Sequence, residues 1–137
     1  MILGPQVKWY DGYLTLAEEL GGRTDDASLR SAISRAYYYV YHLALVRAKA
    51  NNFILNPDEG SHAQLWRLFR ENPEPDCKQL ALIAQRLKEK RVRADYELTF
   101  PRIKDEVPEV LKAASSFAQL LAQLPLRHPN QGSVRRQ

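Results

Sequence analysis

The sequence predicts an all-α protein, an antiparallel up-and-down bundle of four to five helices. Apolar residues recur at three- and four-residue steps along most of the chain, which is the spacing of a buried helical face. No stretch shows the period-two alternation of a half-buried strand. Breaker segments such as NPDEG (56–60) and ENPEP (71–75) separate the helical stretches, and short connections favour antiparallel neighbours.

The longest helix is expected from Asp25 to Asn51, a stretch without Pro or Gly. Thr24, Asp25 and Asp26 are candidates to cap its first turn. One apolar stripe comprises Leu29, Ile33, Ala36, Tyr37, Val40, Ala44 and Arg47, and further large residues off this stripe are Tyr38, Tyr39, Tyr41, Leu43, Leu45 and Val46. A helix that is apolar nearly all round is buried on more than one side. We therefore expect a central helix whose second side is covered by another copy, which makes the protein a homodimer.

Four further helices are expected around it. They cover residues 9–20, 61–70, 77–97 and 105–124. Asp76 and Gln79 have the spacing of a capping box before the fourth helix. Pro108 is tolerated only in a first turn, so the last helix should begin close to Asp105.

Composition limits the class of protein. The chain has 137 residues, a net charge of +4 and a single cysteine, Cys77. This length suits one domain, here placed at residues 1–124, followed by a flexible basic tail at 125–137. We expect a cytoplasmic protein without membrane contact, because no apolar run is long enough to span a bilayer, no signal-peptide pattern opens the chain and no intramolecular disulfide can form.

The most chemically distinctive stretch is RLKEKRVRADYEL (86–98), with five cations within eight residues. These cations are Arg86, Lys88, Lys90, Arg91 and Arg93. Such a patch suits a phosphate backbone, with Tyr96 available for base stacking. On charge alone, a solvated face in which Glu89 and Asp95 pair with arginines is the commoner outcome.

The histidines do not have the spacing of metal ligands, so no metal or other cofactor is expected. His42 lies among the tyrosines of the long helix and is either a general base or a core histidine. His62 follows Ser61 at a helix start, where a capping or loop role is expected. His128 is in the tail. No glycine-rich phosphate loop, nucleophile elbow or dinucleotide fingerprint is present.

Three segments together resemble the HEPN superfamily. They are SAISRAYYYVYHLA (31–44), GSHAQLWRLF (60–69) and LKEKRVRADYEL (87–98). The chain is most similar to the small stand-alone branch, which pairs a Ser-Arg-Ala-Tyr-Tyr helix with a later Arg-x-x-Ala-Asp-Tyr signature. The resemblance covers about residues 10–122 and implies a bundle that dimerises with its motif helices facing each other across a cleft.

The resemblance also implies an activity, metal-independent RNA cleavage by an Arg followed four to six residues later by a His. Arg91 matches the Arg, but the His position holds Tyr96. An unperturbed Tyr has a pKa of about 10 and is a poor base at pH 7. Arg91 retains the fixed charge that stabilises a pentacoordinate phosphate. Catalysis would then need His42 or Asp95 from either protomer, or would be absent.

Small HEPN proteins are often encoded beside a minimal nucleotidyltransferase, as toxin and antitoxin, so the resemblance implies such a partner. In some pairs the nucleotidyltransferase adenylylates a tyrosine beside the motif, and Tyr96 is the matching residue here. Three functions stay open: a HEPN-type RNase toxin, a non-catalytic HEPN module that binds a nucleotidyltransferase, and a helical interaction protein unrelated to nucleic acid. The missing His favours the second, and the basic helix favours the first or second over the third.

Overall fold

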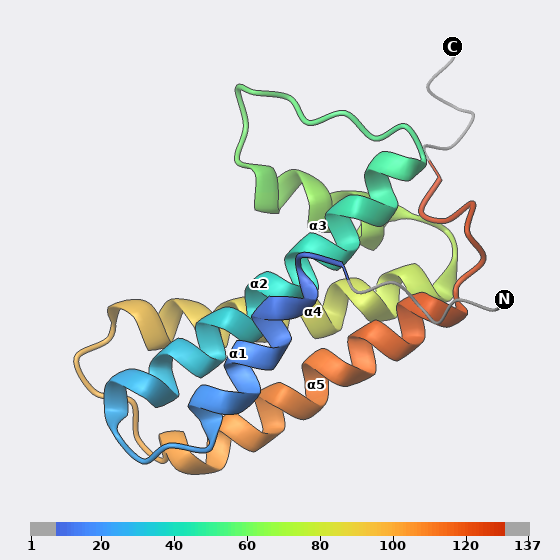
Figure 1. Cartoon of the computed structure of the whole chain (residues 1–137). Helices are drawn as coiled ribbons and strands as arrows, with labels where there is room; N and C mark the ends of the chain where they lie inside the picture. Colours follow the sequence, from blue (N-terminus) through green and yellow to red (C-terminus); the bar gives the residue numbers. More distant parts are fainter. Residues whose placement is uncertain (1–7, 131–137) are drawn as a thin grey trace, which may run out of the picture.

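The computed structural model describes residues 8–130, and within this range all regular structure is helical, without a strand (Figure 1). The helices are α1 (Asp11–Gly21), α2 (Asp26–Ala50), α3 (Ser61–Glu71), α4 (Pro75–Tyr96) and α5 (Ile103–Gln123). The predicted all-helical class is confirmed, and each helix lies within two residues of its predicted bounds.

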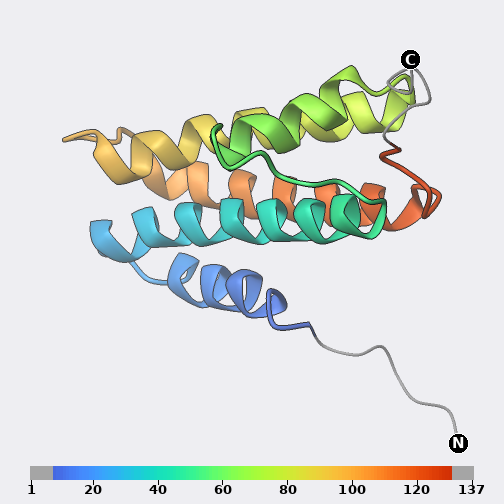
Figure 2. The same ribbon diagram turned by 90° about the horizontal axis from the view of Figure 1, so that it is seen from above.

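Helix α2 is the centre of the bundle and contacts each of the other four helices. Figure 2 shows it between α1 on one side and α3 and α4 on the other, with α5 alongside. This arrangement explains its apolar character all round. Tyr39 and Tyr41 were expected to meet a second copy, but each is only 7% exposed within the single chain. Surrounding helices of the same chain therefore cover Tyr39 and Tyr41, whereas Tyr38, Leu43 and Leu45 remain partly exposed and Val46 is exposed.

Capping residues fix where α2 and α4 begin. The Asp25 carboxylate accepts a hydrogen bond from the Ser28 backbone N–H at 3.0 Å, as predicted. At α4 the prediction of Asp76 as cap is wrong. The N-cap is Glu74, whose side chain accepts from the Asp76 N–H, and Pro75 occupies the first turn. Proline suits this position because the first helical N–H groups have no partner within the helix.

Helix α5 begins two residues earlier than predicted, at Ile103 rather than Asp105. Its N-cap Arg102 has a φ of 60°, so the chain reverses sharply after Pro101. Pro108 consequently lies beyond the first turn, where it lacks the N–H that would bond to the Lys104 carbonyl. The inward face of α5 still follows the predicted stripe, with Val107, Val110, Ala114, Phe117 and Leu121 buried.

Residues 125–130 differ from the predicted flexible tail, because polar side chains hold their backbone. The Arg47 guanidinium donates to the carbonyls of Leu121 at 2.8 Å and His128 at 3.1 Å. Asn51 donates to the Leu126 carbonyl at 3.0 Å, and His128 is buried. Periodicity cannot reveal such contacts, since they satisfy backbone carbonyls rather than bury an apolar face. The remainder of the predicted tail, 131–137, lies outside the described residues.

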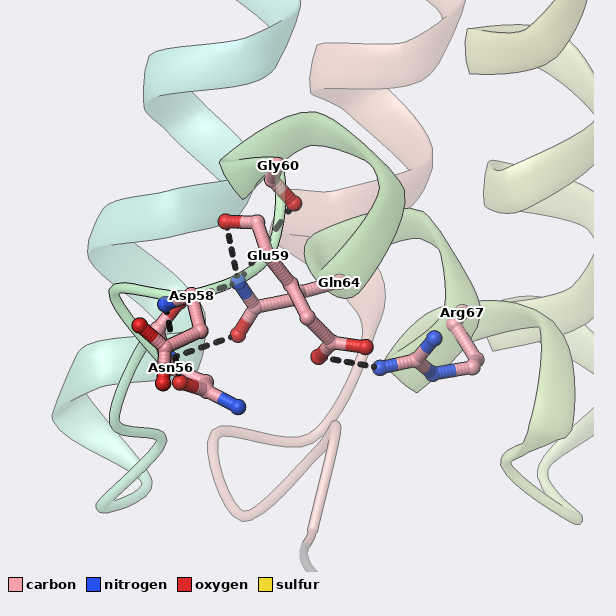
Figure 3. A network of polar contacts seen from close by, with 6 residues as sticks. All are labelled: Asn56, Asp58, Glu59, Gly60, Gln64 and Arg67. Atoms are coloured by element: carbon pink, nitrogen blue, oxygen red, sulfur yellow. Dashed lines mark hydrogen bonds and ion pairs between the residues drawn. The ribbon is translucent and has the colours of Figure 1, made fainter.

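A polar network fixes the loop before α3 (Figure 3). The Gln64 side chain accepts from the Asn56 N–H at 2.7 Å and donates to the carbonyls of Asn56 at 2.7 Å and Glu59 at 2.9 Å. Glu59 also pairs with Arg67 at 3.1 Å. These bonds hold the start of α3, and hence Ser61 and His62, at a fixed place beside α2.

None of the helices in residues 8–130 is both long and apolar enough to cross a membrane.

Candidate functional site

Arg91 of α4 lies against two tyrosines of α2. Its Cζ is 5.5 Å from the ring centroid of Tyr37 and 5.6 Å from that of Tyr38. Its Nη1 donates to Asp95 Oδ2 at 3.2 Å, one turn along the same helix. The side chain is 13% exposed, and its buried Nε has no hydrogen-bond partner among the described residues. Burial alone would lower the pKa of Arg91, but Asp95 and the tyrosines raise it overall.

His62 of α3 packs on the same pair of tyrosines. Its Nδ1 is 2.6 Å from the Tyr37 hydroxyl, and its ring centroid lies 6.0 Å from that of Tyr38. The ring also stacks on Tyr41 at 4.1 Å between centroids. Sequence reasoning expected only a capping or loop role for His62. The signal that could have indicated more was the place of His62 in the segment GSHAQLWRLF, one of the three segments of the resemblance. Helical periodicity alone does not show which helix this segment faces.

Hydrogen bonding determines the tautomer that we assign to His62. Trp66 Nε1, which can only donate, donates to the Tyr37 hydroxyl at 3.0 Å. The hydroxyl proton is then directed to His62 Nδ1, which must be an acceptor. The proton of neutral His62 therefore sits on Nε2, which makes that nitrogen a hydrogen-bond donor.

Burial and the nearby positive charges of Lys88 and Arg91 lower the pKa of His62 to about 4. A second proton on the ring would also leave the Tyr37 hydroxyl with two donors and no acceptor for its own proton. His62 is consequently neutral at pH 7, and the excess charge at this place is carried by arginine and lysine.

His42, the histidine predicted as a possible general base, lies on α2 beside Tyr41. It contacts Trp9 at 4.8 Å and Tyr13 at 5.2 Å between centroids, and its own neighbour Tyr41 separates it from His62. Burial lowers its pKa. Of the predicted catalytic residues, Arg91 and Asp95 therefore lie together. The histidine that packs on the same tyrosines as Arg91, Tyr37 and Tyr38, is His62 rather than His42.

Tyr96 points away from this cluster. Its side chain is 75% exposed and forms no side-chain hydrogen bond with residues 8–130. It lies at the end of α4, five residues after Arg91, a spacing that places the two on different faces of a helix. Tyr96 thus takes no part in the Arg91 cluster within one chain, and its hydroxyl is open to modification.

The predicted basic patch is divided between two faces of α4. Arg86, Lys90 and Arg93 follow each other at four- and three-residue steps, and Lys90 pairs with Glu106 of α5. Arg93 pairs with Glu97 at 3.3 Å. Lys88 shares the opposite face with Arg91 and Asp95. The cations therefore do not form one surface for a phosphate backbone.

No group of three or more metal-binding side chains occurs in the described part of the chain. Cys77 is buried, which raises the pKa of its thiol to about 11 and leaves it unreactive near neutral pH. Comparisons with protein-family models, curated proteins and solved structures each found no match.

Proposed function

We propose that this chain is an RNA-directed HEPN-type protein, a metal-independent endoribonuclease that acts as the toxin of a toxin–antitoxin module. The observation that carries the proposal is that Arg91 and His62 pack on the same two tyrosines, Tyr37 and Tyr38. The motif histidine is missing at Tyr96, and His62 supplies an imidazole at the same cluster. The expected antiparallel arrangement of the helices, and a homodimer whose motif helices face each other across a cleft, belong to this proposal.

The arrangement suggests a division of roles in RNA cleavage. Asp95, an acceptor beside Arg91, takes the proton of the 2′-hydroxyl as its oxygen attacks phosphorus. Arg91 and the Nε2–H of His62 stabilise the negative oxygens of the pentacoordinate phosphate. The bond from phosphorus to the 5′-oxygen breaks, that oxygen takes up the proton, and a 2′,3′-cyclic phosphate results. Arg91 and His62 need only a fixed charge and a hydrogen bond, Asp95 needs only to take up the proton and return it to the 5′-oxygen, and none of these roles needs a metal.

The test is RNA cleavage by the purified chain with and without EDTA. We expect cleavage that survives EDTA and falls at least about 100-fold in Arg91→Ala, because this change removes the charge opposite the developing phosphorane. Arg93→Ala is the matched control, since Arg93 lies on the same helix and has the same four-residue pairing, with Glu97. Circular dichroism would verify that both variants fold.

The second candidate is a non-catalytic HEPN module that partners a nucleotidyltransferase. It is favoured by the Arg91–Asp95 pair, which already neutralises the arginine, and by the exposed Tyr96, which is open to adenylylation. If folded protein whose mass shows Tyr96 to be unmodified does not cleave RNA, the ribonuclease proposal is wrong, and the non-catalytic module is the remaining candidate.

A further inference from the structure

A strip of aromatic rings and guanidinium groups continues from Arg91 across α2 to the start of α1. Tyr38 has Arg91 on one side, and the Cζ of Arg35 is 5.8 Å from its ring centroid. Arg35 is also 5.9 Å from the ring of Tyr13, which stacks on His42 at 5.2 Å. We call this set the aromatic strip, and its members are Trp9, Tyr13, Arg35, Tyr38 and His42.

The strip has faces available to a ligand. Trp9 packs edge-on against His42 at 4.8 Å, yet 68% of it remains exposed. Tyr13, Arg35, Tyr38 and His42 are all partly exposed. Arg35 forms no ion pair within residues 8–130, in contrast to Arg91, Arg93 and Lys90. The strip therefore combines open rings with a cation that no carboxylate neutralises.

We propose that the aromatic strip binds single-stranded RNA and leads it to Arg91. Sites for unpaired strands combine rings on which bases stack with cations that contact the phosphates, and in the strip the cation Arg35 lies near the rings of both Tyr13 and Tyr38. A duplex keeps its bases stacked inside and cannot use the rings. This inference rests on the proposed function, because it names the path of the same substrate, and it places that path on α1 and α2 rather than on the basic face of α4.

The experiment uses an uncleavable 2′-O-methyl oligonucleotide of about ten nucleotides, within the usual site size. Tryptophan fluorescence reports directly on the strip, because Trp9 is exposed whereas Trp66 is only 2% exposed. We expect saturable quenching by the single strand that is lost in Trp9→Phe and absent with a duplex of the same sequence. A signal that does not change with added single strand would overturn the proposal.

Variants test whether the strip contributes to affinity, measured by fluorescence anisotropy of a labelled strand. We expect Trp9→Ala to weaken binding about five- to one-hundred-fold through lost stacking. Arg35→Gln should weaken binding and lower the salt dependence by about one phosphate contact. Arg102→Gln is the charge control, as this side chain is 80% exposed and lies outside the strip. Strip variants that bind like the control would contradict the inference.

Two further outcomes are distinct. If Trp9→Ala converts a dimer into a monomer in sedimentation and leaves RNA affinity unchanged, the strip is an interface between copies and the RNA inference is wrong. If the strand binds as expected but ribonuclease activity is absent, the strip stands and the proposed catalysis fails. If Trp9→Ala cleaves RNA with an unchanged KM, the proposed catalysis stands and the RNA-binding role of the strip is wrong.

Discussion

At the scale of single residues, the Tyr37 hydroxyl links α2 to α3 through two hydrogen bonds. It accepts from Trp66 of α3, bonds to His62 and belongs to a fully buried side chain of α2. Burial raises the pKa of Tyr37 to about 12, so the hydroxyl keeps its proton throughout the neutral range. A hydroxyl that stays protonated keeps Nδ1 of His62 as an acceptor, and this in turn keeps the Nε2–H directed away from Tyr37.

The lowered pKa of His62 predicts a loss of stability in acid. In the unfolded chain His62 takes up a proton as the pH falls below its usual pKa of 6.5, whereas in the folded chain it takes up this proton only near pH 4. The contribution of neutral His62 to the free energy of unfolding is therefore fully present above pH 6.5 and is lost as the pH falls towards 4. The limit for one proton is about 1.4 kcal/mol per pH unit, and the slope stays below it because the ring is partly exposed. Urea denaturation between pH 7.5 and 4 measures it.

The matched variant is His62→Gln, whose side-chain carbonyl still accepts from Tyr37. It should flatten the decline between pH 6.5 and 4 while leaving the remainder, to which His42 contributes in the same direction. NMR titration of the ring provides an independent check. Protonation of His62 with a midpoint near 6.5 in the folded protein would contradict the prediction.

At the scale of helices, the sequence was sufficient to predict existence, order and inward faces. The stripe of α5 and the buried face of α2 follow from three- and four-residue spacing, because burial on one side imposes it. The ends were less predictable. Glu74 rather than Asp76 caps α4, since Pro75 in the first turn moves the cap outward.

The candidate site was predictable only in part, for a related reason. Arg91 was predicted from the resemblance to the HEPN motif, and Asp95 as a possible base that follows it four residues later on the same helix. His62 was missed because its contact with Tyr37 joins residues from α3 and α2, and local spacing carries no information about such contacts. The division of the basic patch follows from helical geometry, but which face meets α2 becomes apparent only when the helices are packed.

Arg47 gives a prediction at this scale, because it stabilises the end of α5. The last carbonyls of a helix lack partners within it, and Arg47 donates to those of Leu121 and Leu124 at 2.8 and 3.3 Å. Arg47→Met keeps the aliphatic stem and removes these bonds, so we expect the free energy of unfolding to fall by about 2–4 kcal/mol. Lys49→Met, at an exposed position of the same helix, should stay within about 0.5 kcal/mol. Equal urea midpoints for the two variants would contradict the capping role.

At the scale of the whole molecule, α2 makes the five helices interdependent. It contacts every other helix, and removal of α2 would leave α1 without most of the surface on which it packs, whereas α3 packs mainly on α4. A short helix is marginal in water without tertiary packing. The proposed site shares this dependence, because Arg91, His62 and the aromatic strip all meet on tyrosines of α2.

This arrangement predicts that the chain unfolds as one unit, and Ile33 is the residue with which to test it. Ile33 is fully buried on α2, and Ile33→Ala should lower the free energy of unfolding by about 2–5 kcal/mol through a cavity that its neighbours cannot fill. Far-UV circular dichroism reports on all helices, whereas the fluorescence of Trp66 in a Trp9→Phe background reports on α3. We expect the two signals to change at the same urea concentration, both in the Trp9→Phe protein and in the same protein with Ile33→Ala added.

Ile54→Ala, at a position that is 86% exposed, is the control and should change stability by less than about 0.5 kcal/mol. A fluorescence transition that precedes the loss of helix would mean that α3 opens separately from α2. His62 would then leave Arg91 while most of the bundle remained folded, and the two residues could not act as one preformed site. Coincident transitions instead mean that the cluster exists whenever the bundle does, because the same packing on α2 holds both.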